Sequence, residues 1–205
     1  MYLSCYILNP RAAEVRRALK SSYEMHRTVM SAFRSNVGDS PRKDMNILYR
    51  LVDNGKVHKL YVSSSEQPIK QMPEGFIKVQ GSPKDLSHLD NIFDIGQLYS
   101  FDLMAAPTKK IDIPGKKNSK RVFLCKLEER EDWLKTKAQQ NGFTLLSFCE
   151  ENQEGNKLKD GYYNSIVFKG TLKVTDKEKF LNAYKKGIGA EKAFGCGMLL
   201  LSPAL

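Results

Sequence analysis

A tyrosine and a histidine stand three residues apart near the amino end of the chain, at Tyr23 and His26. On a helix this spacing puts both side chains on one side, with Cβ atoms roughly 5–6 Å apart. Histidine exchanges a proton near neutral pH, and tyrosine can donate a hydrogen bond or orient a neighbour. RNA cleavage needs groups of this kind, because a base must activate the 2′-hydroxyl and an acid must protonate the leaving 5′-oxygen. His26 also fits the apolar face of its helix as a hydrogen-bonded core residue, so both interpretations stay open.

A glycine-rich segment at residues 187–197 (GIGAEKAFGCG) is the second candidate site. It lacks the Gly-Lys-Ser/Thr ending of a Walker A motif, and its glycine spacing is not that of a dinucleotide-binding fingerprint. Glycines allow the backbone to approach a phosphate chain with its amides exposed. The alternative is a helix cap followed by a tightly packed strand. The residues of interest are Gly187, Gly189, Lys192, Gly195 and Gly197.

Basic residues dominate the segment 109–121, where Asp112 is the single acid. Such a turn-rich segment could follow the phosphates of an RNA groove, although a solvated loop is the usual fate of a run of charges. A smaller pair of lysines lies in the polar stretch 150–161. The candidate phosphate contacts are Lys116, Lys117, Lys120, Arg121, Lys157 and Lys159.

The composition favours a globular chain with a polyanionic partner. The 205 residues carry 33 Lys and Arg against 23 Asp and Glu, a net charge of +10. Such a charge is typical of nucleic-acid binding, although a merely basic protein is the alternative. No apolar run approaches the ~18 residues of a membrane-spanning helix, and the amino end does not resemble a signal peptide. We therefore expect a cytoplasmic protein without a membrane partner.

Cysteine and histidine spacing argues against metal or cofactor chemistry. The four cysteines are far apart in sequence, and no pair of histidines has metal-ligand spacing. All four cysteines lie in apolar surroundings, which predicts small core residues. We expect no metal and no cofactor.

The pattern of apolar residues predicts an α+β fold. Strands are expected at 2–9, 46–52, 57–63 and 76–80, with one long helix from Pro10 to about Phe33. The second half has a similar alternation of strands and helices, with strands expected at 98–106, 122–127, 143–149, 162–174 and 196–202. Its helices are expected at 128–140 and from the capping-box pattern 175–178 to Gly187. Each half approximates the βαββαβ motif of a ferredoxin-like (RRM-like) domain, which predicts two tandem domains at 1–96 and 97–205.

These residues together resemble a known family, the CRISPR-associated precursor-RNA endoribonucleases of type I-E systems in the RAMP superfamily. The resemblance covers nearly the whole chain. It begins at residues 1–4 (MYLS), continues through Tyr23 and His26, and ends with the segment 187–201 (GIGAEKAFGCGMLLL).

The resemblance implies a metal-independent cut at the 3′ base of the hairpin in CRISPR repeat RNA. The expected products carry a 5′-hydroxyl and a 2′,3′-cyclic phosphate, and the mature stem-loop crRNA stays with the other Cascade subunits. His26 corresponds to the family's general acid or base, and Tyr23 to its partner. The glycine-rich segment would support the RNA backbone, and the basic segment would lie along the stem. A non-catalytic RNA-binding scaffold of the same fold is the alternative.

Overall fold

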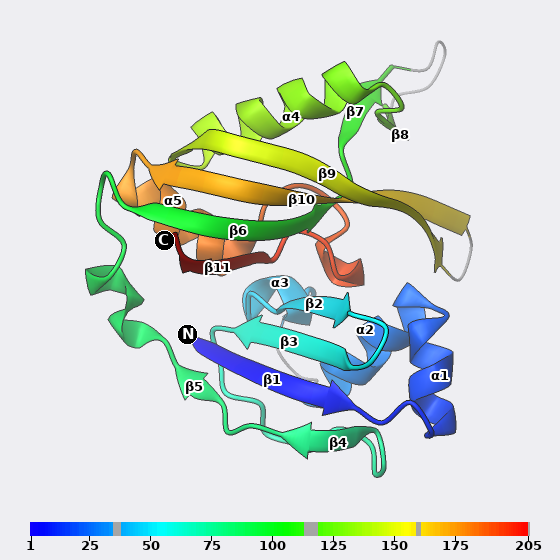
Figure 1. The fold of residues 1–205 in the computed structure, drawn as a ribbon. Coiled ribbons are helices and arrows are strands. Elements are labelled where there is room, and N and C mark those ends of the chain that lie inside the picture. Colours follow the sequence, from blue (N-terminus) through cyan, green and yellow to red (C-terminus); the bar gives the residue numbers. More distant parts are fainter. Residues whose placement is uncertain (35–37, 113–118, 159–160, 205) are drawn as a thin grey trace.

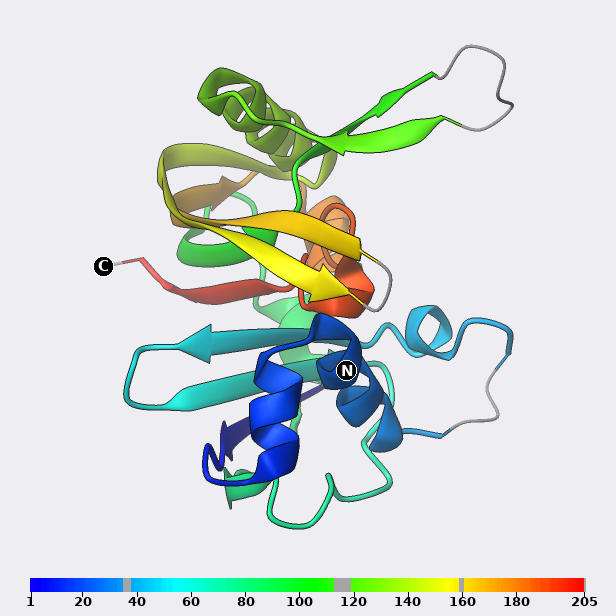
Figure 2. The same cartoon turned by 90° about the vertical axis from the view of Figure 1, so that its right-hand side faces the viewer.

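A computed structural model describes residues 1–34, 38–112, 119–158 and 161–204. Two antiparallel sheets lie one above the other, each with helices against it, and a short two-stranded hairpin projects from the second (Figures 1 and 2). The first part of the chain contains β1 Tyr2–Leu8, α1 Ala13–Leu19, α2 Ser22–Ser31, α3 Pro41–Asp44, β2 Leu48–Asp53, β3 His58–Ser64, β4 Ile77–Gln80, β5 Lys84–Asp85 and the 3-10 helix η1 Ser87–Asn91. The second contains β6 Leu98–Ala105, β7 Thr108–Ile111, β8 Lys120–Phe123, α4 Leu127–Gln140, β9 Phe143–Leu158, β10 Gly161–Val174, α5 Lys177–Lys186, the 3-10 helix η2 Lys192–Phe194 and β11 Leu199–Pro203.

The strand order confirms two tandem ferredoxin-like domains in an α+β fold. The first sheet has the order β2-β3-β1-β4, and the larger sheet of the second domain has the order β11-β6-β10-β9. In both sheets the first strand of the domain lies between its third and fourth strands. The second helix of the motif is missing from the first domain, where residues 65–76 form no helix.

The long helix expected between Pro10 and Phe33 is in fact two helices, so that prediction was wrong. α1 ends at Leu19 and α2 begins at Ser22. The side chain of Ser21 accepts a hydrogen bond from the backbone N–H of Glu24, which satisfies a free donor in the first turn of α2. The break lets the helix that carries His26 take its own direction.

The expected strands 143–149 and 162–174 leave the polar stretch 150–161 outside the sheet, and this prediction was also wrong. β9 and β10 continue as one long hairpin, paired from Val174 and Phe143 out to Gly161 and Leu158. Backbone hydrogen bonding between adjacent strands does not depend on side-chain polarity, so the ladder extends beyond the apolar residues that marked the strands. Its outer end lies beside α2 (Figure 2), where the Tyr163 hydroxyl is 3.2 Å from the Ser22 hydroxyl.

Each sheet has its own apolar core. Leu89 and Phe93, which precede the expected domain boundary, pack with the core of the second domain. The division at residue 96 stays a prediction.

Two smaller expectations need correction. Cys196 is buried, but Cys125 and Cys149 are exposed and Cys5 is half-buried, because their strand and loop positions face outward. α5 is capped by the side chain of Asp176, one residue later than the pattern 175–178 indicated.

Within the described residues, no helix combines the length and apolar character needed to cross a membrane.

Candidate active site

His26 lies on α2 of the first domain and faces η2 of the second. Its half-buried ring donates a hydrogen bond to the backbone carbonyl of Ala193. The ring of Phe194 meets it edge-on, with the ring centroids 6.0 Å apart. The histidine is therefore not a residue of one closed core, because it lies where the two domains meet.

The surroundings of His26 keep its imidazole neutral near pH 7. Burial and the nearby positive charge of Arg42 both lower the pKa of His26 below its usual value, and the Ala193 carbonyl opposes them in part. With one ring nitrogen donating to Ala193, the other nitrogen of the neutral ring has a free lone pair. That nitrogen can accept a proton, which is the requirement for a general base.

Removing the Arg42 charge is expected to raise the pKa of His26. Arg42 belongs to α3, and its guanidinium donates to the Ile47 carbonyl at 3.2 Å. In Arg42→Gln the repulsion of the imidazolium disappears, but burial remains, so the pKa of His26 should rise and still stay below 6.5. NMR titration of the ring protons measures the shift. Arg42→Lys retains the charge and serves as the control, and an unchanged pKa in Arg42→Gln would contradict this electrostatic assignment.

Tyr23 lies one turn before His26 on α2 and is also half-buried. The guanidinium of Arg27 lies 5.9 Å from the centre of its ring. No hydrogen bond or ring contact joins Tyr23 to His26 among the described residues. Their shared helix face is confirmed, but a direct link between the two side chains is not seen.

A basic groove with a volume of about 440 Å³ runs beside η2. It lies between the hairpin of β7 and β8, the last turns of α4 and the glycine-rich segment. Among the described residues, four cations and no acid line it, and these cations are Lys110, Arg121, Lys137 and Lys192. Lys192 is the first residue of η2, and the next two residues, Ala193 and Phe194, contact His26. The groove therefore adjoins the surroundings of His26.

Lys192 has a structural role as well as a place in the groove. Its ammonium donates to the carbonyls of Lys186 at 2.9 Å and Gly187 at 2.6 Å, at the end of α5. Burial, together with the positive charges of Arg42, Lys137 and Lys186, lowers the pKa of Lys192. An ammonium has three donors, so one remains for a ligand. This concentration of like charge favours an anion in the groove.

The glycines of the glycine-rich segment have two roles, because they pack tightly in a turn and some of them also border the groove. Gly195 and Gly197 are buried. A Cβ on Gly197 would lie 2.7 Å from the Ile188 carbonyl oxygen, and its φ of +87° disfavours any other residue. Gly187 is buried as well, and a Cβ there would lie 3.0 Å from the Gly197 carbonyl oxygen, whereas Gly189 is half-buried. Both glycines also border the groove. The segment is therefore a tightly packed turn in both halves, and its half-buried Gly189 is the glycine with the greater exposure to the groove.

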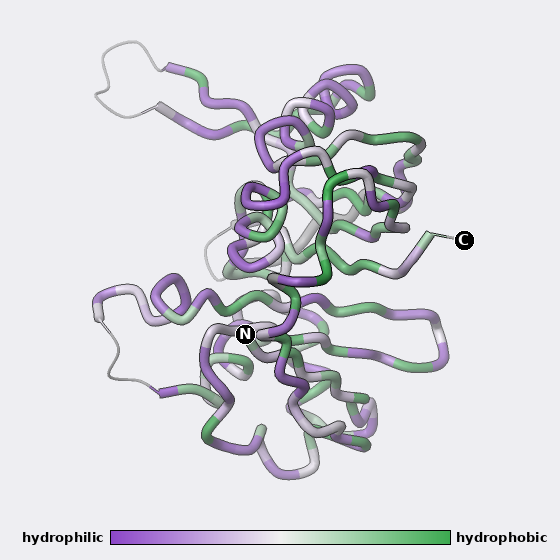
Figure 3. The backbone as a smooth tube through the Cα atoms, turned by 90° about the vertical axis from the view of Figure 1, so that its left-hand side faces the viewer, coloured by the Kyte–Doolittle hydropathy of each residue, from purple (hydrophilic) through white to green (hydrophobic). Residues whose placement is uncertain are grey.

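The basic segment forms the hairpin of β7 and β8, whose arms are mostly hydrophilic and project from the second domain (Figures 2 and 3). Lys110 pairs directly with Arg121, so two like charges face each other across the strands. Such a pair is destabilising without a counter-ion. Lys120 is exposed on the same hairpin, whereas Lys109 forms an ion pair with Glu129 at 2.6 Å.

Three of the candidate lysines, Lys116, Lys117 and Lys159, lie outside the described residues. For Lys157 the structure gives the backbone, which pairs with Tyr162 near the outer end of the long hairpin. None of these lysines is therefore placed in the site by a side-chain contact.

Arg42 and Lys137 belong to the site but were not among the residues singled out from the sequence. Arg42 follows a polar stretch of sequence and lies in the short α3, and nothing in its spacing ties it to His26. Lys137 lies in the last turn of α4, where a cation beside the carbonyl end of a helix is ordinary. Only the fold brings either of them to η2.

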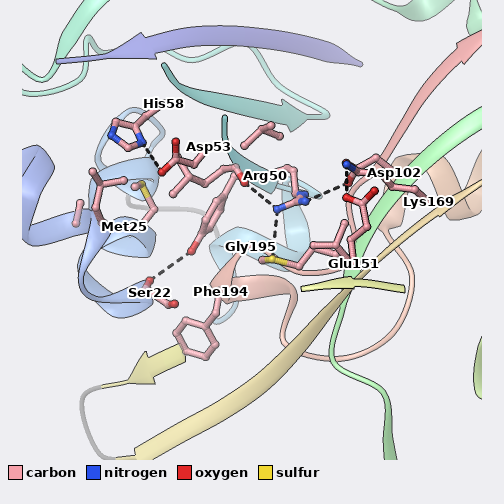
Figure 4. A pocket seen from close by; sticks show the side chains of 17 residues that line it. Ser22, Met25, Arg50, Asp53, His58, Asp102, Glu151, Lys169, Phe194 and Gly195 are labelled. Atoms are coloured by element: carbon pink, nitrogen blue, oxygen red, sulfur yellow. Dashed lines mark hydrogen bonds and ion pairs between the residues drawn. The ribbon is translucent and has the colours of Figure 1, made fainter. Parts of the chain in front are cut away.

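A second cleft, of about 320 Å³, lies between the domains on the other side of η2 (Figure 4). There the Arg50 guanidinium of β2 forms an ion pair with Asp102 of β6 at 3.1 Å. Phe194 contacts His26 and also lines this cleft. η2 thus lies between the basic groove and this cleft, and its residues contact both domains.

Comparison with known proteins agrees with this geometry. Residues 1–203 match the family described as CRISPR associated protein. The CRISPR-associated endoribonuclease Cse3 of Thermus thermophilus is 29% identical over 99% of this chain and 100% of its own length. The Cascade subunit CasE of Escherichia coli is 30% identical over 46% of this chain and 49% of its own. A structure of Cse3 bound to a 19-nucleotide RNA superimposes with a TM-score of 0.84 at 28% identity, covering 98% of both chains. The chain therefore belongs to the family of CRISPR-associated proteins.

Proposed function

We propose that this protein is a metal-independent endoribonuclease that cuts precursor CRISPR RNA at the 3′ base of the repeat hairpin. The observation that carries the proposal is a neutral, hydrogen-bonded His26 one element away from a groove lined by four cations. The endoribonuclease and RNA complex among its relatives support the same reaction class.

In the proposed reaction the 2′-oxygen attacks the adjacent phosphorus, and the free ring nitrogen of His26 takes the 2′-hydroxyl proton. The bond from phosphorus to the 5′-oxygen then breaks, and that oxygen takes a proton from solvent, to which the imidazolium returns its own. The products are a 2′,3′-cyclic phosphate and a 5′-hydroxyl. Tyr23 is proposed to donate a hydrogen bond to the phosphate oxygens and to hold them in line for the attack.

The groove is proposed to bind the phosphates of the RNA stem. Lys110, Arg121 and the exposed Lys120 would extend this contact along the β7–β8 hairpin. On the opposite wall the half-buried Gly189 would offer backbone, and the buried Gly187 would hold the turn beside it. The remaining proposed phosphate contacts are Lys116, Lys117, Lys157, Lys159 and Lys192. The buried Gly195 and Gly197 would shape the turn that holds η2.

Neutralising two groove cations should weaken RNA binding in a salt-dependent manner. The double variant Lys110→Ala/Arg121→Ala removes a facing pair of like charges, so the hairpin itself should not lose stability. The slope of log affinity against log salt should fall by about 2, close to 1 for each lost phosphate contact. Lys135→Ala removes an exposed lysine of α4 that does not line the groove and is the control, and filter binding over a salt series is the measurement. An unchanged slope would remove this groove from the RNA interface.

After the cut, the protein is proposed to keep the mature stem-loop crRNA and to remain with other Cascade subunits in the cytoplasm. The relative named as a Cascade subunit supports this assignment. Because retained product would block a second cycle, only single-turnover rates report the chemical step.

The test is single-turnover cleavage of an end-labelled repeat hairpin in excess EDTA, followed by analysis of the product ends. We expect one cut at the 3′ base of the stem, with a cyclic phosphate on the upstream product and a 5′-hydroxyl on the downstream product. Cleavage that requires an added divalent cation would refute the metal-independent reaction. Tight, salt-sensitive binding without any cut across a panel of repeat hairpins would support the RNA-binding scaffold instead.

A further inference from the structure

We propose that the Tyr163 hydroxyl of β10 is a positioning group for His26, acting through η2. This inference rests on the proposed function, because it concerns the same histidine. It adds a residue of the second domain to a site whose proton-transfer group belongs to the first.

Tyr163 contacts η2 in two ways. Its hydroxyl lies 2.7 Å from the Phe194 carbonyl oxygen and donates to it. Its ring lies against the Phe194 ring, with centroids 6.0 Å apart and planes at 32°. Phe194 in turn meets the His26 ring, and the residue before it, Ala193, accepts the imidazole hydrogen bond. Tyr163 therefore fixes both the carbonyl and the ring of the residue that touches His26.

The same hydroxyl also reaches the helix that carries His26. It lies 3.2 Å from the Ser22 hydroxyl, in the first turn of α2. A phenol has one proton, and the shorter contact assigns that proton to the Phe194 carbonyl, so Ser22 is the donor in the longer one. The Ser22 carbonyl accepts from the Tyr49 hydroxyl at 3.3 Å (Figure 4). One half-buried hydroxyl thus joins β10, η2 and α2.

The link keeps one protonation state throughout the working range of pH. Burial raises the pKa of Tyr163 above its ordinary value, with the neighbouring Cys196 adding to the effect. Burial also raises the pKa of the Cys196 thiol to about 12. His26 itself feels the Arg42 charge from α3 and the Ala193 carbonyl from η2. The Tyr163 hydroxyl and the Cys196 thiol therefore stay protonated near neutral pH, and the hydrogen bond to Phe194 keeps its donor.

Tyr163→Phe tests the proposal, because it keeps the ring against Phe194 and removes only the hydroxyl. The Phe194 carbonyl would lose its donor, and η2 would no longer be held at a fixed distance from α2. A displaced catalytic group costs up to about 100-fold in rate, so we expect single-turnover cleavage to fall about 10-fold to 100-fold. RNA affinity should stay within about twofold of wild type, because no groove cation changes.

A second readout needs no RNA. The nitrogen NMR shifts of the imidazole distinguish a nitrogen that carries a proton from one that does not. In wild type the bond to Ala193 should hold one tautomer, and in Tyr163→Phe the two nitrogens should become more alike. If the wild type fails to cut RNA, the proposed function fails, and this measurement still decides whether Tyr163 positions His26.

Tyr99→Phe is the matched control. It removes a hydroxyl that donates to Gln97 at 2.7 Å in the second domain and touches neither α2 nor η2. Ser22→Ala is a second test variant, should Tyr163→Phe fold poorly, and it should change the rate and the imidazole shifts in the same direction by a smaller factor. Wild-type rates and shifts in Tyr163→Phe and Ser22→Ala would overturn the proposal. Equal losses of rate in Tyr163→Phe and Tyr99→Phe, with unchanged imidazole shifts, would overturn it as well.

Discussion

Replacing His26 with alanine is expected to reduce the single-turnover rate of hairpin cleavage by about 10²–10⁴-fold, the usual contribution of a positioned acid–base group. The imidazole is neutral near pH 7 and has one nitrogen free to accept a proton. Alanine removes that acceptor and leaves the Ala193 carbonyl without its donor. RNA affinity should hardly change, because the four groove cations remain in place.

Two controls make this result specific to His26. His88→Ala removes an exposed histidine on η1 and should cut at the wild-type rate. An RNA with a sulfur in place of the 5′-oxygen at the cut needs no acid, because a thiolate leaves unaided. If His26 is the base, His26→Ala stays slow on this RNA. Restored cleavage would assign His26 the role of acid, and full activity of His26→Ala on ordinary RNA would refute its catalytic role.

The second large effect is expected at the ion pair between the domains. The Arg50 side chain is 8% exposed and that of Asp102 is 22% exposed. Arg50→Met leaves the Asp102 carboxylate with Lys169 at 4.0 Å as its remaining partner. Breaking a buried pair from one side costs about 3–5 kcal/mol. We expect about 3 kcal/mol of lost unfolding free energy, because Lys169 and partial exposure soften the penalty.

Urea denaturation measures the loss, with two comparisons. Arg34→Met breaks an exposed pair with Glu66 and should cost less than about 1 kcal/mol. The double variant Arg50→Met/Asp102→Leu removes both charges and should recover most of the stability that Arg50→Met loses. A double variant no more stable than Arg50→Met would show that the cost comes from packing and not from the unpaired carboxylate.

Local sequence patterns predicted much of the fold. The expected strands 46–52 and 57–63 are separated by the segment 53–56 (DNGK), which is typical of a tight turn. β2 and β3 are joined there in a register that pairs Asp53 with His58. The helix expected at 128–140 begins at Leu127 and ends at Gln140. In each case the signal lies within a few neighbouring residues, so no knowledge of distant contacts was needed.

The errors arose where an interaction outside the pattern decides the structure. The apolar face from Val15 to Phe33 is continuous, and the side chain of Ser21 nevertheless ends one helix and starts the next. The spacing of Ser21 and Glu24 is that of a capping box and could have signalled the break. The long hairpin had no such signal, because strand pairing beyond Cys149 depends on its partner strand.

In the candidate site, too, local spacing could be predicted from the sequence, and contacts between distant residues could not. The spacing of Tyr23 and His26 placed them on one helix, but the choice between a core histidine and a catalytic one depended on η2, which is more than 160 residues away in sequence. Arg42 and Lys137 join the site by folding alone. The four groove cations come from four separate elements or turns, so the sequence could predict a basic partner but not this groove.

The most direct test of the account is single-turnover cleavage, in EDTA, of a repeat hairpin with one 2′-deoxyribose immediately before the cut. The account predicts that this RNA binds with wild-type affinity and stays intact, while the all-ribose hairpin is cut at one place. Cutting of the 2′-deoxy RNA at the same position would contradict attack by the 2′-hydroxyl, and with it the chemical role proposed for His26.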